Sequence, residues 1–254
     1  MDSYQTESTQ TCPICSATQI RSFSHQVLGK HEVAYFYCSN CGLLNTEQPY
    51  WLDEAYEEAI IEKDTGLVAR NLANAKTLAW ALPILGKGSG KLLDVAGGYG
   101  LLARLLRDRG FDCFTTDKFC KNLFAKEFEP REDFTADALF AFEVLEHIPD
   151  PLLFVSDLFT KFDCKTFIFS TQTFSETPPP PDWWYYVFEC GQHISFYQPR
   201  TLKLMASKLG CRHYLLEPGL HLFTNETLCV KQRILLFNSL AKAGSKSIHK
   251  LRDS

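Results

Sequence analysis

The spacing of apolar residues predicts helices that alternate with strands over most of the chain after residue 50. Apolar residues recur every three or four positions over residues 50–85, which predicts one or two helices before a glycine-rich stretch. Residues 91–117 then have the pattern of an apolar strand, a glycine turn, an amphipathic helix that ends at Gly110, and a second strand. This order of elements predicts a βαβ unit.

The same alternation continues and predicts an α/β fold with a doubly wound, mostly parallel sheet. The expected elements are strands at 136–144 and 165–174, helices at 151–162 and 199–210, and a closing strand pair at 211–218 and 227–232. Between Asn122 and Phe140 we expect a further strand only in a short or degenerate form. The loop at 175–199 has too many prolines for a strand and too many aromatic residues for a flexible linker, so we expect it to cover a site.

Composition and charge limit the classes of protein to which the chain can belong. Hydrophobic residues make up 45% of the 254 residues and aromatic residues 13%, which is enough apolar surface for a core and excludes a disordered chain. The formal net charge of −4 gives no overall field for a polyanion and argues against a nucleic-acid partner. The sequence has no apolar run of about 18 residues and no signal-peptide pattern, so we expect no membrane span and a cytoplasmic location.

Two C-x-x-C pairs near the N-terminus predict a metal site, with Cys12, Cys15, Cys38 and Cys41 as its ligands. Two thiolates three positions apart on a tight turn can reach one ion, and two such turns complete a tetrahedron around zinc. Gly42 suits the left-handed turn that follows the second pair. Four thiolates leave no open coordination position, so we expect a structural zinc ion in a zinc ribbon.

Four parts follow from these patterns. We expect a zinc-ribbon domain at 1–49, connecting helices at 50–88, the α/β domain at 89–232, and a basic, helical tail at 233–254.

The segment LLDVAGGYG (residues 92–100) has the strand, turn and helix start that let backbone N–H groups approach a nucleotide cofactor. A Gly-x-Gly-x-x-Ala pattern from Gly98 onward fits a dinucleotide fingerprint, with Asp117 near the place of the ribose-binding acid. Taken from Asp94, the same segment fits the acidic motif of S-adenosylmethionine enzymes. Asp94 favours this second interpretation, because a carboxylate there repels a pyrophosphate but attracts an ammonium and a sulfonium. A glycine turn without a ligand is the third interpretation.

Four segments together resemble the class I S-adenosylmethionine-dependent methyltransferases. LLDVAGGYG resembles the first cofactor motif, TTDKF the second, FEVLEHIPDP the segment after the fourth strand, and HISFYQPRTLKLMASKLG a later segment of the small-molecule members. Ala96 replaces the usual first glycine, so we expect a slightly wider turn. The resemblance implies a Rossmann-like sheet and S-adenosylmethionine as the cofactor.

The resemblance also implies which residues contact the cofactor. The glycine loop would line its methionine part, and Asp117 would accept both ribose hydroxyls. The implied cofactor-binding residues are Asp94, Ala96, Gly97, Gly98, Gly100, Asp117, Lys118, Phe119, Phe142 and Glu143. Tyr56 and Arg70 are expected to close over the cofactor. The acid that contacts adenine is not identified.

The zinc-ribbon start combined with EHI and QHISFY is similar to methyltransferases that act on nucleotide-linked sugars. In that group a histidine pair flanks the acceptor, and the matching residues are His147 and His193. Methyl transfer needs a held geometry and a base for the acceptor proton, and histidine titrates near neutral pH. The aromatic residues 183–186 can stack on a sugar or a base, and Tyr186 adds a phenol to the expected catalytic residues.

We therefore expect a methyltransferase that acts on a small, sugar-like acceptor. Three alternatives stay open: an RNA methyltransferase with a zinc module, a cofactor-binding scaffold protein without turnover, and a nicotinamide oxidoreductase. No motif records whether carbon, oxygen or nitrogen receives the methyl group, or the oligomeric state.

Overall fold

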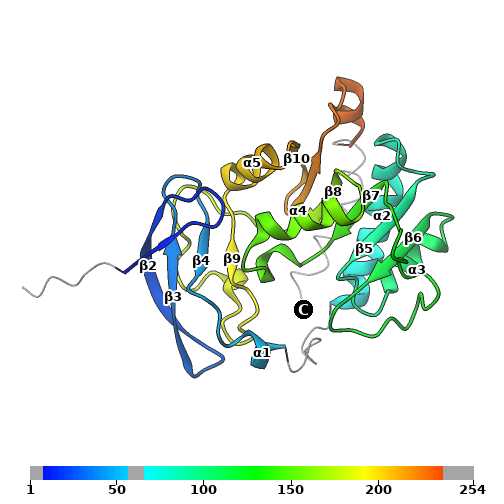
Figure 1. Ribbon diagram of the computed structural model, residues 1–254. Helices are drawn as coiled ribbons and strands as arrows, with labels where there is room; N and C mark the ends of the chain where they lie inside the picture. The colour runs from blue at the N-terminus through cyan, green and yellow to red at the C-terminus, as the bar shows by residue number, and fades with distance from the viewer. Residues whose placement is uncertain (1–7, 57–65, 237–254) are drawn as a thin grey trace, which may run out of the picture. The chain divides into compact units, whose positions relative to one another are not determined.

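The computed structural model describes residues 8–56 and 66–236, which form two compact units (Figure 1). The first unit comprises the described residues within 1–59, 143–156 and 171–209, and the second comprises those within 60–142, 157–170 and 210–254. These units differ from the predicted four parts, because the chain passes between them several times.

The second unit contains a six-stranded sheet in the order β10-β11-β8-β7-β5-β6 (Figure 1). Its strands are β5 (Lys91–Val95), β6 (Asp112–Thr116), β7 (Ala138–Ala141), β8 (Thr166–Ser170), β10 (Arg212–Glu217) and β11 (Leu220–Thr224). The strands β6, β5, β7 and β8 are parallel, whereas β11 runs antiparallel to β8 and to β10. The chain moves outward from β5 in both directions, which confirms the doubly wound α/β fold.

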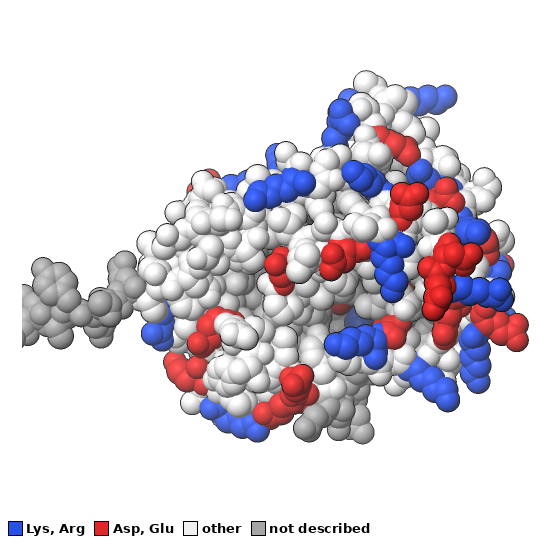
Figure 2. Space-filling view, viewed as in Figure 1, with Lys and Arg blue, Asp and Glu red and all other residues white. Residues whose placement is uncertain are grey.

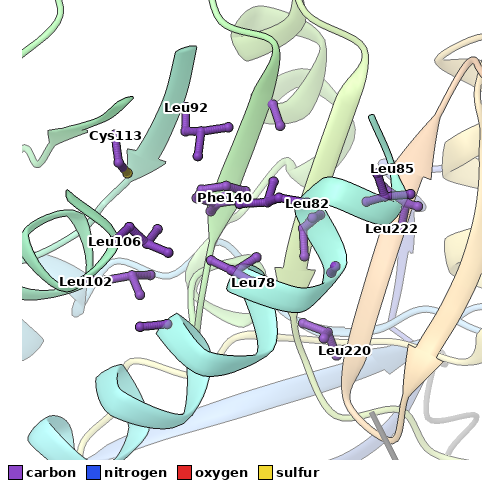
Figure 3. Packing of buried hydrophobic residues seen from close by; sticks show 14 of the residues in the cluster. Leu78, Leu82, Leu85, Leu92, Leu102, Leu106, Cys113, Phe140, Leu220 and Leu222 are labelled. Carbon is purple, nitrogen blue, oxygen red and sulfur yellow. The ribbon is translucent and has the colours of Figure 1, made fainter. Parts of the chain in front are cut away.

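Helices α2 (Leu67–Ile84) and α3 (Leu101–Arg107) supply the apolar side chains that bury one part of this sheet. Figure 3 shows Leu78 and Leu82 of α2 beside Phe140 of β7, with Leu102 and Leu106 of α3 nearby. The three-or-four-residue spacing predicted for α2 places Leu78 and Leu82 on the buried face of that helix. Each fully buried leucine contributes roughly 1.5–3 kcal/mol to the driving force for folding. The helix α4 (Pro151–Lys161) contains residues of both units.

Two details of this sheet bear on the predictions. Residues 117–137 contain no strand, in agreement with the short or degenerate strand expected there. The expected second closing strand at 227–232 is wrong: the returning strand is β11, and residues 230–236 are helical. The reason is the left-handed Gly219 (φ 78°), which turns the chain directly after β10. Of the basic tail predicted at 233–254, residues 233–236 are helical and residues 237–254 lie outside the described residues. Residues 1–7, and residues 57–65 of the predicted connecting helices, also lie outside them.

The first unit contains a five-stranded sheet in the order β1-β2-β3-β4-β9. Its strands are β1 (Thr9–Thr11), β2 (Thr18–Val27), β3 (His31–Tyr37), β4 (Leu44–Thr46) and β9 (Ser195–Phe196). Each neighbouring pair is antiparallel. The sheet that begins in the cysteine-containing segment therefore does not end at residue 49, because β4 pairs with β9 from much later in the chain.

Short helices and an aromatic core complete the first unit. The helices are α1 (Leu52–Ala55), the 3₁₀ helices η1 (Leu145–His147) and η2 (Trp184–Tyr186), and α5 (Pro199–Lys208). Tyr35, Tyr186 and Phe196 form edge-to-face and tilted contacts with one another in the core. The proline-rich loop thus contributes its aromatic residues to the packing of this unit.

Charged side chains of both signs share the surface of the molecule. On the face shown in Figure 2, lysine and arginine side chains are mixed with aspartate and glutamate. Among the helices of the described ranges, none has the length and apolar character needed to cross a bilayer.

Candidate functional site

The four predicted cysteine ligands lie together in the first unit. The four Sγ atoms all lie within 4.8 Å of one another. The Sγ atoms of Cys12 and Cys41 are 3.5 Å apart, and those of Cys15 and Cys38 are 3.4 Å apart. A tetrahedral zinc ion with bonds of about 2.3 Å holds its sulfur ligands roughly 3.8 Å apart. The cluster therefore has the size and chemistry of a zinc site with four cysteine ligands.

Each cysteine pair folds into its own tight turn, and the two turns have the same geometry. The Ser16 N–H donates to the Cys12 carbonyl at 2.9 Å, and the Gly42 N–H donates to the Cys38 carbonyl at 2.8 Å. The residue after each pair is left-handed, with φ of 62° at Ser16 and 85° at Gly42. A Cβ atom at Gly42 would also collide with the Gln198 side chain. Two turns of one geometry present their thiols to a common centre, as a zinc ribbon requires.

The glycine loop follows β5 in the second unit. Ala96, Gly98 and Gly100 have left-handed backbone, with φ of 54°, 58° and 80°. Ala96 thus adopts the conformation that the usual glycine adopts without steric cost. A Cβ atom at Gly98 would meet nothing within 4 Å, whereas one at Gly100 would collide with Asn122. The backbone at Gly98 is therefore open to close approach by a ligand.

Asp94 lies buried on β5 beside this loop, with 2% of its surface exposed. Among the described residues, its Oδ2 atom and the hydroxyl of Thr115 have no hydrogen-bond partner. Both atoms lie against Gly97, where a Cβ atom would collide with them. Burial and the nearby carboxylate of Asp117 raise the pKa of Asp94 to about 8. Buried polar atoms are normally paired, so these two suit the polar or cationic group of a ligand.

Asp117 directly follows β6 and is half-buried. Its Oδ2 atom accepts the Gly98 N–H at 2.8 Å, and its Oδ1 atom accepts the Phe119 and Cys120 N–H groups at 2.7 Å. The carboxylate thus fixes the glycine loop against the turn after β6. Lys118 and Phe119 are exposed on that turn. The Oδ1 atom already accepts two donors, so only Oδ2 keeps capacity for a further one, and the expected contact with both ribose hydroxyls stays a prediction.

Phe142 and Glu143 follow β7, where the chain leaves the second unit. Phe142 packs on the second-unit core, with its ring 6.5 Å from that of Phe140. Glu143 is exposed and left-handed, with φ of 54°. Such a conformation is costly for a residue other than glycine and is enriched at functional sites. The cofactor contacts expected of both residues stay predictions.

The two predicted histidines contact each other in the first unit. The rings of His147 and His193 are 4.8 Å apart at an interplanar angle of 83°. The Nδ1 atom of His193 donates to the Tyr185 carbonyl at 2.7 Å, which leaves the lone pair of a neutral ring on Nε2. The hydroxyl of Tyr56 lies 2.9 Å from Nδ1 of His147. Burial and the neighbouring His193 lower the pKa of His147 to about 3, and burial lowers the pKa of His193.

Glu146 and Tyr185 lie beside the histidine pair. The sequence patterns assigned no role to Glu146, and to Tyr185 only the stacking role that it shares with its aromatic neighbours. The Tyr185 hydroxyl donates to Oε1 of Glu146 at 2.6 Å. The Oε2 atom of Glu146 is buried and has no partner among the described residues. Burial and the carboxylate of Glu143 raise the pKa of Glu146 to about 8. The signal in the sequence that could have identified Glu146 is its position directly before His147 in the FEVLEHIPDP segment.

Three further residues that the sequence associates with the site are Tyr186, Tyr56 and Arg70. Tyr186 is 1% exposed, stacks on Phe188, and donates its hydroxyl to the Pro179 carbonyl at 2.8 Å. This placement in the core does not support the catalytic role expected of Tyr186; its neighbour Tyr185 contacts His193 instead. The Tyr56 hydroxyl lies near Nδ1 of His147, and Arg70 is exposed on α2; the expectation that both close over the cofactor stays a prediction.

A family model described as a methyltransferase domain matches residues 67–215, which is more than half of the chain. The chain belongs to this methyltransferase domain family. The matched range of the methyltransferase domain contains the glycine loop and both histidines, and the cysteine quartet precedes it. Membership of the family favours the methyltransferase interpretation of the glycine loop over the nicotinamide interpretation.

Solved structures similar to this methyltransferase include three of low sequence identity. The magnesium protoporphyrin IX methyltransferase of Synechocystis PCC 6803 with bound SAH is 14% identical, with a TM-score of 0.46, over 68% of this chain and 92% of that chain. Human N-acetylserotonin methyltransferase with SAM is 14% identical, with a TM-score of 0.45, over 70% of this chain and 66% of that chain. An O-methyltransferase family protein of Burkholderia thailandensis is 10% identical, with a TM-score of 0.48, over 71% of this chain and 64% of that chain. The comparison with curated proteins finds no match.

Proposed function

We propose that this protein transfers a methyl group from S-adenosylmethionine to a small, sugar-like acceptor. The observation that carries the proposal is the buried, unpartnered Oδ2 atom of Asp94 beside the glycine loop of a methyltransferase domain. When bound, S-adenosylmethionine supplies an electrophilic methyl group on a sulfonium, together with an ammonium group. A cation beside Asp94 stabilises its charged carboxylate, which burial alone disfavours.

The donor-binding residues we propose lie in the second unit. Asp94 and Thr115 offer unpartnered oxygen atoms, and the open backbone at Gly98 permits close approach. Asp117 holds the loop through the Gly98 N–H and is the proposed acceptor for the ribose hydroxyls. The exposed ring of Phe119 is the proposed contact for the adenosine.

The acceptor-binding residues we propose lie in the first unit. The lowered pKa keeps His193 neutral at pH 7, with its basic lone pair on Nε2. His193 is therefore the proposed base, and the proton moves from the acceptor hydroxyl, amine or acidic carbon to Nε2. The ring of His147 packs against that of His193, and Tyr56 contacts His147 in turn. Trp184 is 69% exposed and offers a flat ring on which a sugar can stack.

We further propose that the cysteine quartet holds a structural zinc ion. Support comes from the mutual distances of the four sulfurs and from the two matching turns that present them. The zinc would fix β4 and, through its pairing with β9, the chain that carries His193. The ten cysteines all lie in the described ranges and are thiols, and the location we propose is the cytoplasm, where thiols stay reduced.

Turnover of S-adenosylmethionine against a panel of nucleotide sugars and free sugars tests the proposal, with S-adenosylhomocysteine and methylated product followed by mass spectrometry. We expect product with one acceptor class, and at least a hundredfold lower turnover for His193→Ala at unchanged S-adenosylhomocysteine affinity. His25→Ala is the matched control, because that ring lies outside the histidine pair and stacks on Phe188. Full activity of His193→Ala would remove the base role.

A further inference from the structure

Three side chains around the histidine pair converge as metal ligands do. One donor atom from each of Glu146, His147 and His193 lies within 4.8 Å of the others. We infer that these three residues bind one divalent transition-metal ion, at a site separate from the cysteine quartet. The inference stands on the geometry of this cluster within the first unit and does not require methyl transfer.

The unpartnered oxygen of Glu146 is the first argument for a cation. Its Oε1 atom accepts the Tyr185 hydroxyl, whereas Oε2 is buried without a partner among the described residues. Buried polar atoms are normally paired, so an oxygen of this kind indicates a position for a further binding partner. A metal ion would satisfy Oε2, and the Tyr185 hydroxyl would then orient the ligating carboxylate.

The second argument is the orientation of the histidine rings. Histidines that bind metals donate their other ring N–H to a carbonyl or carboxylate, which fixes the tautomer. His193 has this arrangement, because Nδ1 donates to the Tyr185 carbonyl and Nε2 keeps its lone pair. The ring of His147 has hydrogen-bond contacts with the Tyr56 hydroxyl at Nδ1 and with the Gln192 backbone, and its proposed ligand atom is Nε2. Both rings are half-buried, so an ion can reach them from solvent.

The donor set selects the kind of ion and predicts an effect on activity. Two imidazoles and one carboxylate suit zinc, cobalt, nickel or ferrous iron, and not calcium or magnesium. Metal–ligand bonds of about 2.1 Å require the three donors to move closer by side-chain rotation. The ion would occupy the lone pair that the proposed function assigns to the base, so metal binding and methyl transfer exclude each other.

Metal stoichiometry of the full-length protein tests the inference. The quartet is first filled with zinc, and Co²⁺ is then added in an equilibrium titration. Co²⁺ bound by nitrogen and oxygen shows only weak visible bands, whereas thiolate-bound Co²⁺ absorbs strongly in the near ultraviolet. We expect one Co²⁺ per chain without the thiolate band, and at least tenfold weaker binding in His193→Ala and Glu146→Gln but not in His25→Ala. No binding beyond the quartet, or unchanged binding in His193→Ala, would overturn the inference.

Anomalous scattering from Co²⁺-soaked crystals of the unaltered protein gives a second measurement, should Glu146→Gln fail to fold. A peak between Glu146, His147 and His193 is the expected result, and a soaked crystal without a peak there would overturn the inference. Neither measurement uses methyl transfer. A chain that shows no turnover when free of added metal, but binds the ion once it is added, therefore fails only the proposed function, and an active chain that never binds the ion fails only this inference.

Discussion

The hydroxyl of Thr201 donates a hydrogen bond to the carbonyl of Cys41 at 2.8 Å. The same hydroxyl accepts the Gln198 N–H at 3.1 Å, at the start of α5. A single side chain thus joins the second cysteine turn to the segment that follows His193. The cysteine quartet and the proposed base therefore belong to one structural unit.

Thr201→Val tests this connection. The substitution keeps the shape but removes the hydroxyl, which leaves a buried carbonyl and a buried N–H without partners. We expect a loss of roughly 1–3 kcal/mol in the free energy of unfolding, measured by urea denaturation. Thr201→Ser keeps the hydroxyl and should lose less than half as much. Equal losses in both variants would show that packing, and not the hydrogen bond, matters here.

Asp94→Asn changes how stability depends on pH. The folded pKa of about 8 is above the ordinary value of 3.8, so the folded state binds a proton that the unfolded state releases above about pH 4. The contribution of Asp94 to stability is therefore greatest at low pH and falls as the pH rises toward 8. Relative to Asp94→Asn, the ligand-free protein should lose up to about 1.4 kcal/mol per pH unit between pH 5 and pH 7. Parallel stability curves for the two proteins would contradict the raised pKa.

Ala96→Gly should stabilise the glycine loop. The left-handed conformation costs an L-residue roughly 1–2 kcal/mol, and glycine avoids this cost. Glycine loses about 0.5–1 kcal/mol more chain entropy than alanine on folding, which offsets part of the gain. We expect a net gain of about 0.5–1 kcal/mol in urea denaturation. Gly98→Ala is the reverse control, because its φ of 58° has the same sign and a Cβ atom there meets nothing. It should destabilise by a similar amount; a neutral result for both would mean that the loop relaxes freely.

Tyr185→Phe and Tyr186→Phe compare two adjacent tyrosines with different partners. The first loses the hydrogen bond to Glu146 beside the histidine pair, and the second loses one to the Pro179 carbonyl in the core. Both should lose about 1 kcal/mol in stability. Only Tyr185→Phe should lower turnover with the identified acceptor, by tenfold or more. The prediction fails if Tyr186→Phe has the larger effect on turnover.

The sequence patterns predicted the parts of the molecule that depend on local spacing. The cysteine quartet and the βαβ unit with its glycine loop required only short motifs, and the two histidines came from the family resemblance. The pairing of β4 with β9 was not predictable in this way, since its residues are about 150 positions apart and each strand is two or three residues long. Tyr185 and Tyr186 look alike in sequence, and only the 3₁₀ turn η2 determines which one contacts His193.

Calorimetric titration of the zinc-loaded protein with S-adenosylhomocysteine, beside an identical titration with NAD, decides whether the glycine loop binds S-adenosylmethionine. We expect micromolar binding of S-adenosylhomocysteine, at least tenfold weaker binding by Asp94→Asn, and no binding of NAD. Binding of NAD without binding of S-adenosylhomocysteine would contradict this expectation.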